Sequence, residues 1–334
     1  MKNRPRGERN RLAALTLVVL GPLVAELALG STPVRMAWLL LLWLPIYGAG
    51  VLLIRELVRR FRGGWLSVIL LGVAYELVED GIALQALSSP HLYGAAGWAP
   101  RVLGLNSAYL EANLPYHVVF SVTVPILLTD LLFPRHRHVP YLGRTGLVVT
   151  GLCALAGVAL LRVSVPPNQD PGYMAPPGVL LGCLVAVAVL AVIALGVLPR
   201  RAARPRTDAR VPSARALAGG GFLATLAFMG LLFPFWGAAQ PAFTHGLWVL
   251  LPMAAAAVVA VGTGLLVHHW SASSRWDDRQ CLALAGGALI AHTVFGVVGV
   301  ADTALDRAGL VVLGLLTAWL LLVLARRPPA AATG

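Results

Sequence analysis

The chain has 334 residues, of which 58% are hydrophobic and 12% are charged, against about 45–50% and about 25% in soluble domains. The mean hydropathy is +0.79, and apolar runs of about 20 residues, each long enough to cross a bilayer core of about 30 Å, recur along most of the sequence. These values exclude a soluble enzyme, a secreted disulfide scaffold and a disordered protein. The formal charge of +12 does not indicate nucleic-acid binding, because the basic residues lie between the apolar runs.

The apolar runs predict the fold class. We expect an all-α, polytopic transmembrane bundle that forms a single integral membrane domain over residues 1–334 and lies in the lipid bilayer. The basic leader before the first run makes a cleaved signal peptide the alternative there, but Gly21-Pro22 and Glu26 inside the run favour a retained helix. The ten spans are expected at about 12–30, 34–57, 65–87, 115–133, 144–165, 177–198, 216–235, 246–270, 281–300 and 308–325.

The basic residues predict the orientation of these spans. If the spans alternate in direction, the N-terminus, the loops after even-numbered spans and the C-terminus share one side of the membrane. That side carries 22 of the 26 Lys and Arg residues, and the exceptions are Arg35, Arg101, Arg162 and Arg307. Because cytoplasmic loops carry the excess of Lys and Arg, we expect a multi-pass protein of the cell (plasma) membrane with both termini in the cytoplasm.

Three sequence matches indicate an internal repeat. Residues 142–152 (LGRTGLVVTGL) and 305–315 (LDRAGLVVLGL) agree at eight of eleven positions. Residues 117–122 (HVVFSV) resemble 292–297 (HTVFGV), and 42–48 (LWLPIYG) resemble 231–237 (LLFPFWG). Each match joins span n to span n+5, and an odd offset reverses the orientation of the second copy. The matches predict a five-plus-five inverted repeat with halves 12–165 and 177–326, an architecture common in secondary transporters.

Three carboxyl groups lie inside the third span. Glu76, Glu79 and Asp80 are related by steps of three and four residues, so they share one face of a helix. A charge within a span costs about 2.5–3.5 kcal/mol on insertion scales, and three adjacent anions repel one another. Their alternative role is a structural tie to neighbouring helices, for which one carboxyl would suffice. We therefore predict that this face binds an ion or substrate.

Other polar residues lie at compatible depths in the membrane. Counting 1.5 Å per residue places Glu26, Glu79 and His292 about 15–22 Å from the cytoplasmic side, and places His117 and Asp302 near the outer surface. We count Glu26, His117 and His292 with the acidic face as candidate substrate- or ion-binding residues. For each histidine, an interhelical hydrogen bond is the alternative. At the cytoplasmic helix ends, Arg55-Glu56 and Asp130 are expected to snorkel or to pair.

The longest predicted external segment, about 88–114, is rich in aromatic residues. Such residues are typical of the membrane interface, so the segment is either a loop lying on that surface or a lid over an outward-facing cavity. The second alternative would place it above the acidic face.

Two stretches carry a resemblance to a known family. Residues 57–85, with Arg59-Arg60, Gly64-Trp65 and Tyr75 through Gly81, look like a family of uncharacterised polytopic proteins from actinobacteria and their relatives. Residues 282–289 (LALAGGAL) are similar to a later block of the same family. The resemblance implies a polytopic membrane protein and no particular activity.

A fainter resemblance is to the CAAX-processing and bacteriocin-processing intramembrane proteases. These use a paired acid followed by an arginine, and then two histidine motifs on later helices. Glu79-Asp80 would stand for the acid pair, and His117 and His292 for the histidines. The arginine has no counterpart, because Ala83 and Leu84 follow the pair.

The sequence therefore leaves two main functional hypotheses. The first is a proton- or cation-coupled secondary transporter of a small molecule or ion, without a cofactor. The second is a metal-dependent intramembrane hydrolase, in which Glu79, His117 and His292 would hold a divalent ion such as zinc. A membrane subunit of a larger complex is a third alternative. The oligomeric state and the substrate stay open.

Overall fold

Ten long helical segments make up the bundle, as the ten apolar runs predict. The computed structural model describes residues 11–201, 206–232 and 246–326. The helices of the first five spans are α1 (Arg11–Pro22), η1 (Leu23–Leu27), η2 (Val34–Leu39), α2 (Leu40–Trp43), η3 (Leu44–Ala49), α3 (Gly50–Arg60), α4 (Trp65–Glu76), η4 (Leu77–Ala83), α5 (Ser107–Tyr116), η6 (His117–Thr123), α6 (Val124–Leu132) and α7 (Arg144–Ser164).

The last five spans are built in the same way, and short elements connect the spans. The spans comprise α9 (Pro177–Val192) with η8 (Ile193–Val197), α10 (Ala214–Leu232), α11 (Leu250–Ser271), α12 (Asp278–Phe295) with η13 (Gly296–Val300), and α13 (Ala304–Ala325). The connecting elements are η5 (Leu92–Gly97), β1 (Arg101–Val102), β2 (Leu105–Asn106), η7 (Pro134–His136), α8 (Pro166–Gln169), η9 (Leu198–Arg200) and η12 (Gly246–Val249).

Eight of the described helices are long and apolar enough to cross a membrane. The first and third predicted spans are helical as well, but α1 with η1 is shorter, and α4 with η4 carries the three acids. An all-α polytopic bundle is therefore confirmed.

The fourth span departs from its predicted limits. Its helix begins at Ser107 and not near residue 115, because the polar residues of 107–114 hide a helical turn from hydropathy. The external segment is correspondingly shorter, and His117 lies ten residues, about 15 Å, from the start of the helix. The other end of this span, at Leu132, agrees with the predicted limit, so the depth of His117 counted from that end stays a prediction.

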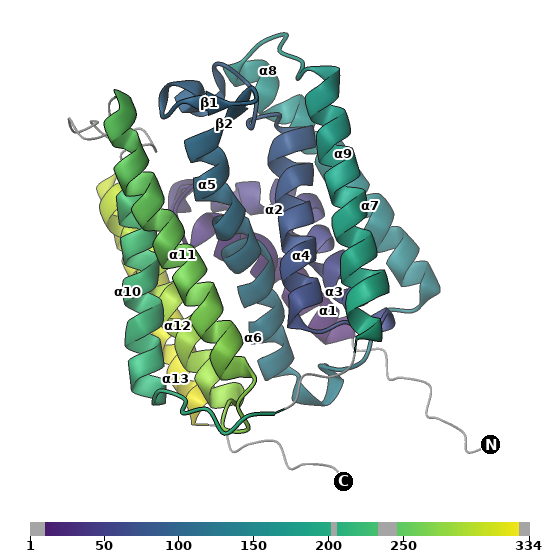
Figure 1. Cartoon of the computed structure of the whole chain (residues 1–334), viewed down its shortest axis with the longest axis vertical. Coiled ribbons are helices and arrows are strands. Elements are labelled where there is room, and N and C mark those ends of the chain that lie inside the picture. Colours follow the sequence, from purple (N-terminus) through teal and green to yellow (C-terminus); the bar gives the residue numbers. More distant parts are fainter. Residues whose placement is uncertain (1–10, 202–205, 233–245, 327–334) are drawn as a thin grey trace.

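Contacts between loops support the alternation of the spans. At one end of the bundle, Arg60 donates to the Leu142 carbonyl, Arg137 pairs with Asp278, and Thr207 bridges to Ser273. At the other end, Ser89 after the third span donates to Asp170 after the fifth, and Figure 1 shows β1, β2 and α8 gathered there. Residues 1–10, 202–205, 233–245 and 327–334, which include some of the counted arginines and part of the third repeat match, lie outside the described residues.

The helices form an inner and an outer group. Within the 18-residue apolar windows of the spans, 67% of the window in Ser107–Leu132 is buried, against 6% in Ala304–Ala325. Helices α7, α9, α11 and α13 expose many large apolar side chains, as expected for surfaces that face lipid. The fourth span is therefore the centre of the bundle, and it packs on α1, α4 and α12.

The two predicted halves meet along this central helix. Tyr116, Phe120 and Val124 of the fourth span share a buried apolar cluster with Leu289 and Phe295 of the ninth. The ninth span is the one that the repeat matches to the fourth. The inverted repeat itself stays a prediction, to be checked by superposing the first five spans on the last five.

Candidate functional site

Four π-helical segments surround a cluster of buried polar side chains. The segments η1, η3, η4 and η6 are π-helical, and they carry Glu26, Tyr47, Glu79 with Asp80, and His117 respectively. π-Turns are rare in proteins and are found frequently at functional sites, because the extra residue in the turn frees backbone groups and redirects side chains.

Proline explains the position of two of these turns. A proline has no N–H group, and its ring clashes with the carbonyl four residues earlier, so it removes one α-helical hydrogen bond and distorts the turn before it. Pro45 is the second residue of η3. Pro125 is the second residue of α6, which begins directly after η6. The sequence analysis did not anticipate π-turns, and η4 contains no proline to announce one.

The acidic face meets His117 across the interface between the third and fourth spans. Glu76, Glu79 and Asp80 are 0%, 2% and 1% exposed, and His117 is 5% exposed. His117 Nε2 lies 3.5 Å from Glu76 Oε2 and 3.8 Å from Asp80 Oδ2. His117 Nδ1 lies 3.4 Å from Glu79 Oε2 and 2.9 Å from Ser121 Oγ. The structure therefore brings all three predicted acids around one predicted histidine.

Two tyrosines each satisfy one carboxylate oxygen of the cluster. Tyr47 Oη, from the second span, donates to Glu79 Oε1 at 2.5 Å. Tyr109 Oη, from the outer turn of α5, donates to Asp80 Oδ1 at 3.1 Å. The Tyr75 ring completes the wall, with its centroid 6.0 Å from that of His117. Sequence reasoning missed the roles of Tyr47 and Tyr109, although each is a polar group inside or beside an apolar span.

The remaining oxygens of the cluster are incompletely hydrogen-bonded. Among the described residues, no fully formed hydrogen bond reaches Glu76 Oε1, Glu76 Oε2, Glu79 Oε2 or Asp80 Oδ2. The Tyr75 hydroxyl interacts with Glu79, and the carboxyls of Glu76 and Asp80 interact with each other. Buried polar atoms are almost always hydrogen-bonded, so the absence of full bonds at four oxygens in one place requires an explanation. A bound cation, or protons shared among the carboxyls, would satisfy them.

Glu26 lies at the edge of this cluster. It interacts electrostatically with Tyr47 and Glu79. Its Oε2 accepts hydrogen bonds from Ser31 Oγ at 3.0 Å and Thr32 Oγ1 at 2.9 Å, both in the loop after η1. Glu26 is therefore a neighbour of the site, and its Oε2 is held by that loop.

His292 occupies a separate position behind Tyr116. It is fully buried, its Nε2 lies 3.2 Å from Tyr116 Oη, and its ring stacks on Phe120 with centroids 4.1 Å apart. The group of potential metal ligands in the described residues is Glu76, Asp80 and His117, whose ligand atoms lie within 4.8 Å of one another. The set proposed for a hydrolase, with His292 beside Glu79 and His117, is not assembled around one point.

Asp302 is exposed and contributes nothing to this group. The buried acid of that loop region is Asp306, which pairs with Arg35 and accepts from Thr303. This contact ties the first external loop to the last one.

The external segment covers the outer end of the site. Asn106 Nδ2 donates to the carbonyls of Ala86 and Ser89, which closes residues 84–106 over the end of η4. The rings of Tyr93 and Tyr109 stack with centroids 6.0 Å apart, and Tyr109 in turn contacts Asp80. We refer to residues 84–106 as the outer cover.

A network of buried charges lies at the end of the bundle that is predicted to be cytoplasmic. Arg55 is fully buried and donates from Nε and Nη2 to Asp130 Oδ1 at 3.0 and 2.9 Å, and Arg59 reaches Asp130 Oδ2 at 2.7 Å. Tyr141 Oη donates to the same carboxylate, and burial raises the pKa of this hydroxyl, so it stays protonated. These groups pair, as one alternative predicted, and Arg55 does not snorkel to the surface. We call Arg55, Arg59, Asp130 and Tyr141 the inner network.

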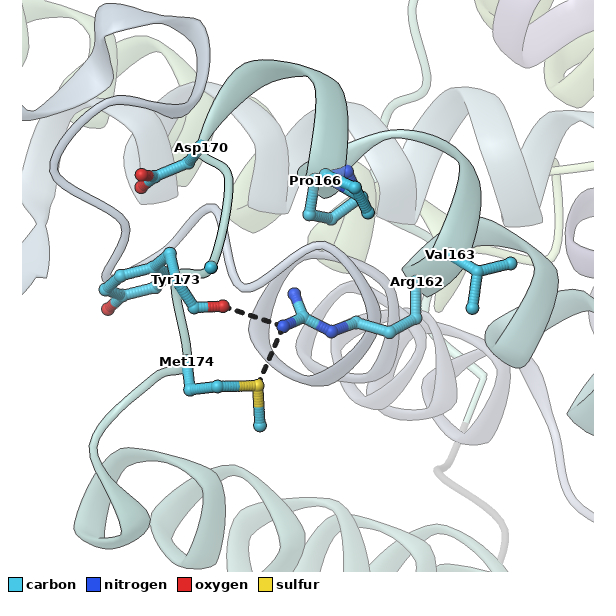
Figure 2. Close-up of a pocket in the computed structure, with 8 residues that line it drawn as sticks. Arg162, Val163, Pro166, Asp170, Tyr173 and Met174 are labelled. Carbon is cyan, nitrogen blue, oxygen red and sulfur yellow. Dashed lines mark hydrogen bonds between the residues drawn. The ribbon is translucent and has the colours of Figure 1, made fainter.

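A surface pocket of about 350 Å³ lies elsewhere, beside α8. Figure 2 shows Arg162 crossing it to the Tyr173 carbonyl at 2.8 Å and the Met174 sulfur at 3.0 Å. Its lining residues belong to the end of α7 and to the loop between the fifth and sixth spans, and none of them is a member of the acidic cluster.

Comparisons with known proteins define the family of the chain. No curated protein and no solved structure matches it. The resemblance to CAAX-type proteases is not supported by these comparisons. A family model described as an uncharacterized membrane protein family matches residues 15–327, and the chain therefore belongs to this family of membrane proteins.

Proposed function

We propose that the protein is a cation-coupled secondary transporter and that Glu76, Glu79, Asp80 and His117 form its cation site. The single observation that carries the proposal is a set of three buried carboxylate oxygens, from Glu76, Glu79 and Asp80, that face one buried imidazole and have no fully formed hydrogen bond. Isolated charges inside a membrane protein are expensive and are commonly found on ion pathways. A cation that binds there and leaves again would account for carboxylates that have no permanent partners.

The broken helices around the site support this proposal. Irregular backbone at membrane depth is tolerated where it is enclosed by protein or lines a cavity, and transporters commonly build their sites from such interrupted helices. Here the residues of the cluster lie on η3, η4 and η6 and at the end of α4. The inverted repeat predicted from the sequence is a second feature that transporters share.

Closures at both ends also agree with transport by alternating access. The outer cover lies above the cluster, and the inner network ties the second and fourth spans below it. A transported cation would cross the protein if one closure opened at a time, so that the site faces the two sides in turn.

The proposal can be tested with purified protein in liposomes. Vesicles containing the full chain would be exposed in turn to inward gradients of Na⁺, K⁺, Mn²⁺ and Zn²⁺, with ion uptake followed by radiotracers or entrapped dyes. We expect uptake of at least one cation by the wild type and none by protein-free vesicles or by Glu79→Gln vesicles. Glu111→Gln, which removes a half-buried carboxylate of α5 outside the cluster, is the matched control. Equal uptake by wild-type and Glu79→Gln vesicles would reject the assigned site.

A further inference from the structure

We propose that the cation bound by this cluster is a divalent first-row transition-metal ion, held by Glu76, Asp80 and His117 Nε2. The inference rests on the proposed function, because the ion is taken as the cation that the transporter carries and not as a resident cofactor. It names the class of that cation, which the presence of acidic residues alone does not.

The distances fit a shared metal ion. Two ligands that each lie about 2.0–2.2 Å from a metal can be at most about 4.4 Å apart. His117 Nε2 is 3.5 Å from Glu76 Oε2 and 3.8 Å from Asp80 Oδ2, so both pairs already meet this limit. All three ligand atoms lie within 4.8 Å of one another. Closing the set around an ion therefore requires at most a small side-chain rotation.

The other ring nitrogen of His117 provides an independent indication. A histidine that binds a metal through one nitrogen usually donates its other N–H to a carboxylate, carbonyl or hydroxyl group, which fixes the ring. Nδ1 lies 2.9 Å from Ser121 Oγ and 3.4 Å from Glu79 Oε2. A proton on Nδ1 would be donated to Ser121 Oγ beside the Glu79 carboxylate, and the lone pair of Nε2 would then be directed towards Glu76 and Asp80.

The convergence of acceptors supports the same conclusion. Glu76 is 0% exposed, and among the described residues neither of its oxygens has a fully formed hydrogen bond, although both lie inside the protein. Asp80 Oδ2 also has no fully formed hydrogen bond, while Asp80 Oδ1 accepts one from Tyr109 Oη. A lone pair of nitrogen and two carboxylate oxygens thus face one another with nothing positive between them. A dication at that point would offset two negative charges at once.

The types of ligand atom in the group indicate which class of metal ion it would bind. Imidazole nitrogen favours zinc, iron, nickel and copper, whereas carboxylate oxygen favours manganese, magnesium and calcium. Mg²⁺ and Ca²⁺ take oxygen ligands almost exclusively. One nitrogen with two carboxylates therefore favours Mn²⁺, Fe²⁺ or Zn²⁺ over Mg²⁺, Ca²⁺ and the alkali ions. No thiolate lies in the group to select a softer ion.

Binding to the purified full chain tests this inference without requiring transport. Protein stripped with a chelator and held in detergent would be titrated with MnCl₂, and free Mn²⁺ would be counted by electron paramagnetic resonance. We expect one Mn²⁺ per chain, displaced by Zn²⁺ and retained in excess Mg²⁺. We expect Asp80→Asn and His117→Gln each to weaken binding at least about 100-fold, since loss of an outer-shell partner alone costs about 10–100-fold.

Two further variants make the result specific. Ser121→Ala removes the partner of Nδ1 and not a ligand, so we expect it to weaken Mn²⁺ binding about 10–100-fold. His292→Gln changes a buried histidine outside the group and should bind Mn²⁺ as the wild type does. Each variant would be compared with the wild type by size-exclusion chromatography and thermal unfolding, so that an unfolded protein is recognised. Wild-type protein without Mn²⁺ binding, or equal losses in His292→Gln and His117→Gln, would overturn the inference.

Uptake measurements separate this inference from the proposed function. If the wild type carries Na⁺ in a Glu79-dependent manner but binds no Mn²⁺ or Zn²⁺, transport stands and the metal inference is wrong. If Mn²⁺ binds one per chain and does not enter proteoliposomes, the metal site stands and the transporter proposal is wrong. Bound Mn²⁺ that enters the vesicles and loses uptake in His117→Gln supports both.

Discussion

Tyr47 and Glu79 connect the second and third spans through a hydrogen bond of 2.5 Å between Tyr47 Oη and Glu79 Oε1. Both residues are buried and both lie on π-helical turns, Tyr47 in η3 and Glu79 in η4. The bond fixes one oxygen of Glu79, so that the other faces the His117 ring at 3.4 Å. Tyr47 is thus a positioning residue for the cluster.

The first prediction concerns Tyr47→Phe. This change removes the donor and leaves a buried carboxylate oxygen unsatisfied, which costs about 1–3 kcal/mol. We expect a lower midpoint in thermal unfolding and weaker cation binding. Tyr93→Phe, in the partly exposed outer cover, is the control and should change little. A Tyr47→Phe protein as stable as the wild type would show that the hydroxyl does not hold Glu79.

The second prediction concerns the inner network. Asp130→Ala leaves the guanidinium of Arg55 buried without its main partner, and breaking a buried ion pair in this way costs about 3–5 kcal/mol. The exposed pair Arg137–Asp278 provides the comparison, because removal of a surface partner costs about 0–1 kcal/mol. Unfolding of both variants in detergent would measure the difference. Equal stability of Asp130→Ala and Asp278→Ala would contradict the role given to Arg55.

The third prediction tests the packing of the fifth span on the second. A Cβ on Gly157 of α7 would lie 2.6 Å from the carbonyl carbon of Pro45, so the two backbones touch. Overpacking a buried position costs about 1–3 kcal/mol, and we expect Gly157→Val to lower the unfolding midpoint accordingly. Gly151→Val lies on the same helix with nothing within 4 Å of the added atom, and it should behave like the wild type.

Much of the fold follows from hydropathy and charge, because the membrane imposes both. Lipid requires long apolar helices, and the predicted start of the fifth span at 144 coincides with that of α7. Hydropathy failed at Ser107, where polar residues form a helix that is buried by other protein and not by lipid.

The candidate site could be predicted only in part. The spacing of Glu76, Glu79 and Asp80 placed them on one face, but sequence gives the depth of a residue and not its neighbours. The hydrogen bond from Tyr109 to Asp80, which joins two helices, could therefore not be predicted. His292 was predicted at a depth compatible with His117, but the Tyr116 ring contacts both and lies between them. The packing of one helix on another determines such contacts, and the periodicity of residues along a single helix does not predict them.

The fourth prediction tests the orientation. In a variant whose native cysteines Cys153, Cys183 and Cys281 are replaced, a new cysteine at Ala96 in the outer cover should react with a membrane-impermeant maleimide added to intact cells. One at Asp208, which is exposed beside Ser274, should react only after the cells are opened. The reverse pattern would place both termini outside and would contradict the predicted orientation.

The last prediction is that Glu79→Gln leaves the fold intact and abolishes cation binding and uptake. Gln has nearly the shape of Glu, and its amide oxygen can still accept the hydrogen bond from Tyr47 Oη. The change removes a negative charge next to His117 Nδ1, where a carboxylate would hold the imidazole proton and keep Nε2 free for the ion. Expression, chromatography and unfolding should therefore match the wild type, while Mn²⁺ binding in detergent and uptake in proteoliposomes should fall together. The control Glu111→Gln makes the same chemical change on α5 outside the cluster, and it should retain both activities. If Glu79 only ties the third span to the second, Gln would serve equally well, and a Glu79→Gln protein with wild-type binding and uptake would establish that structural role.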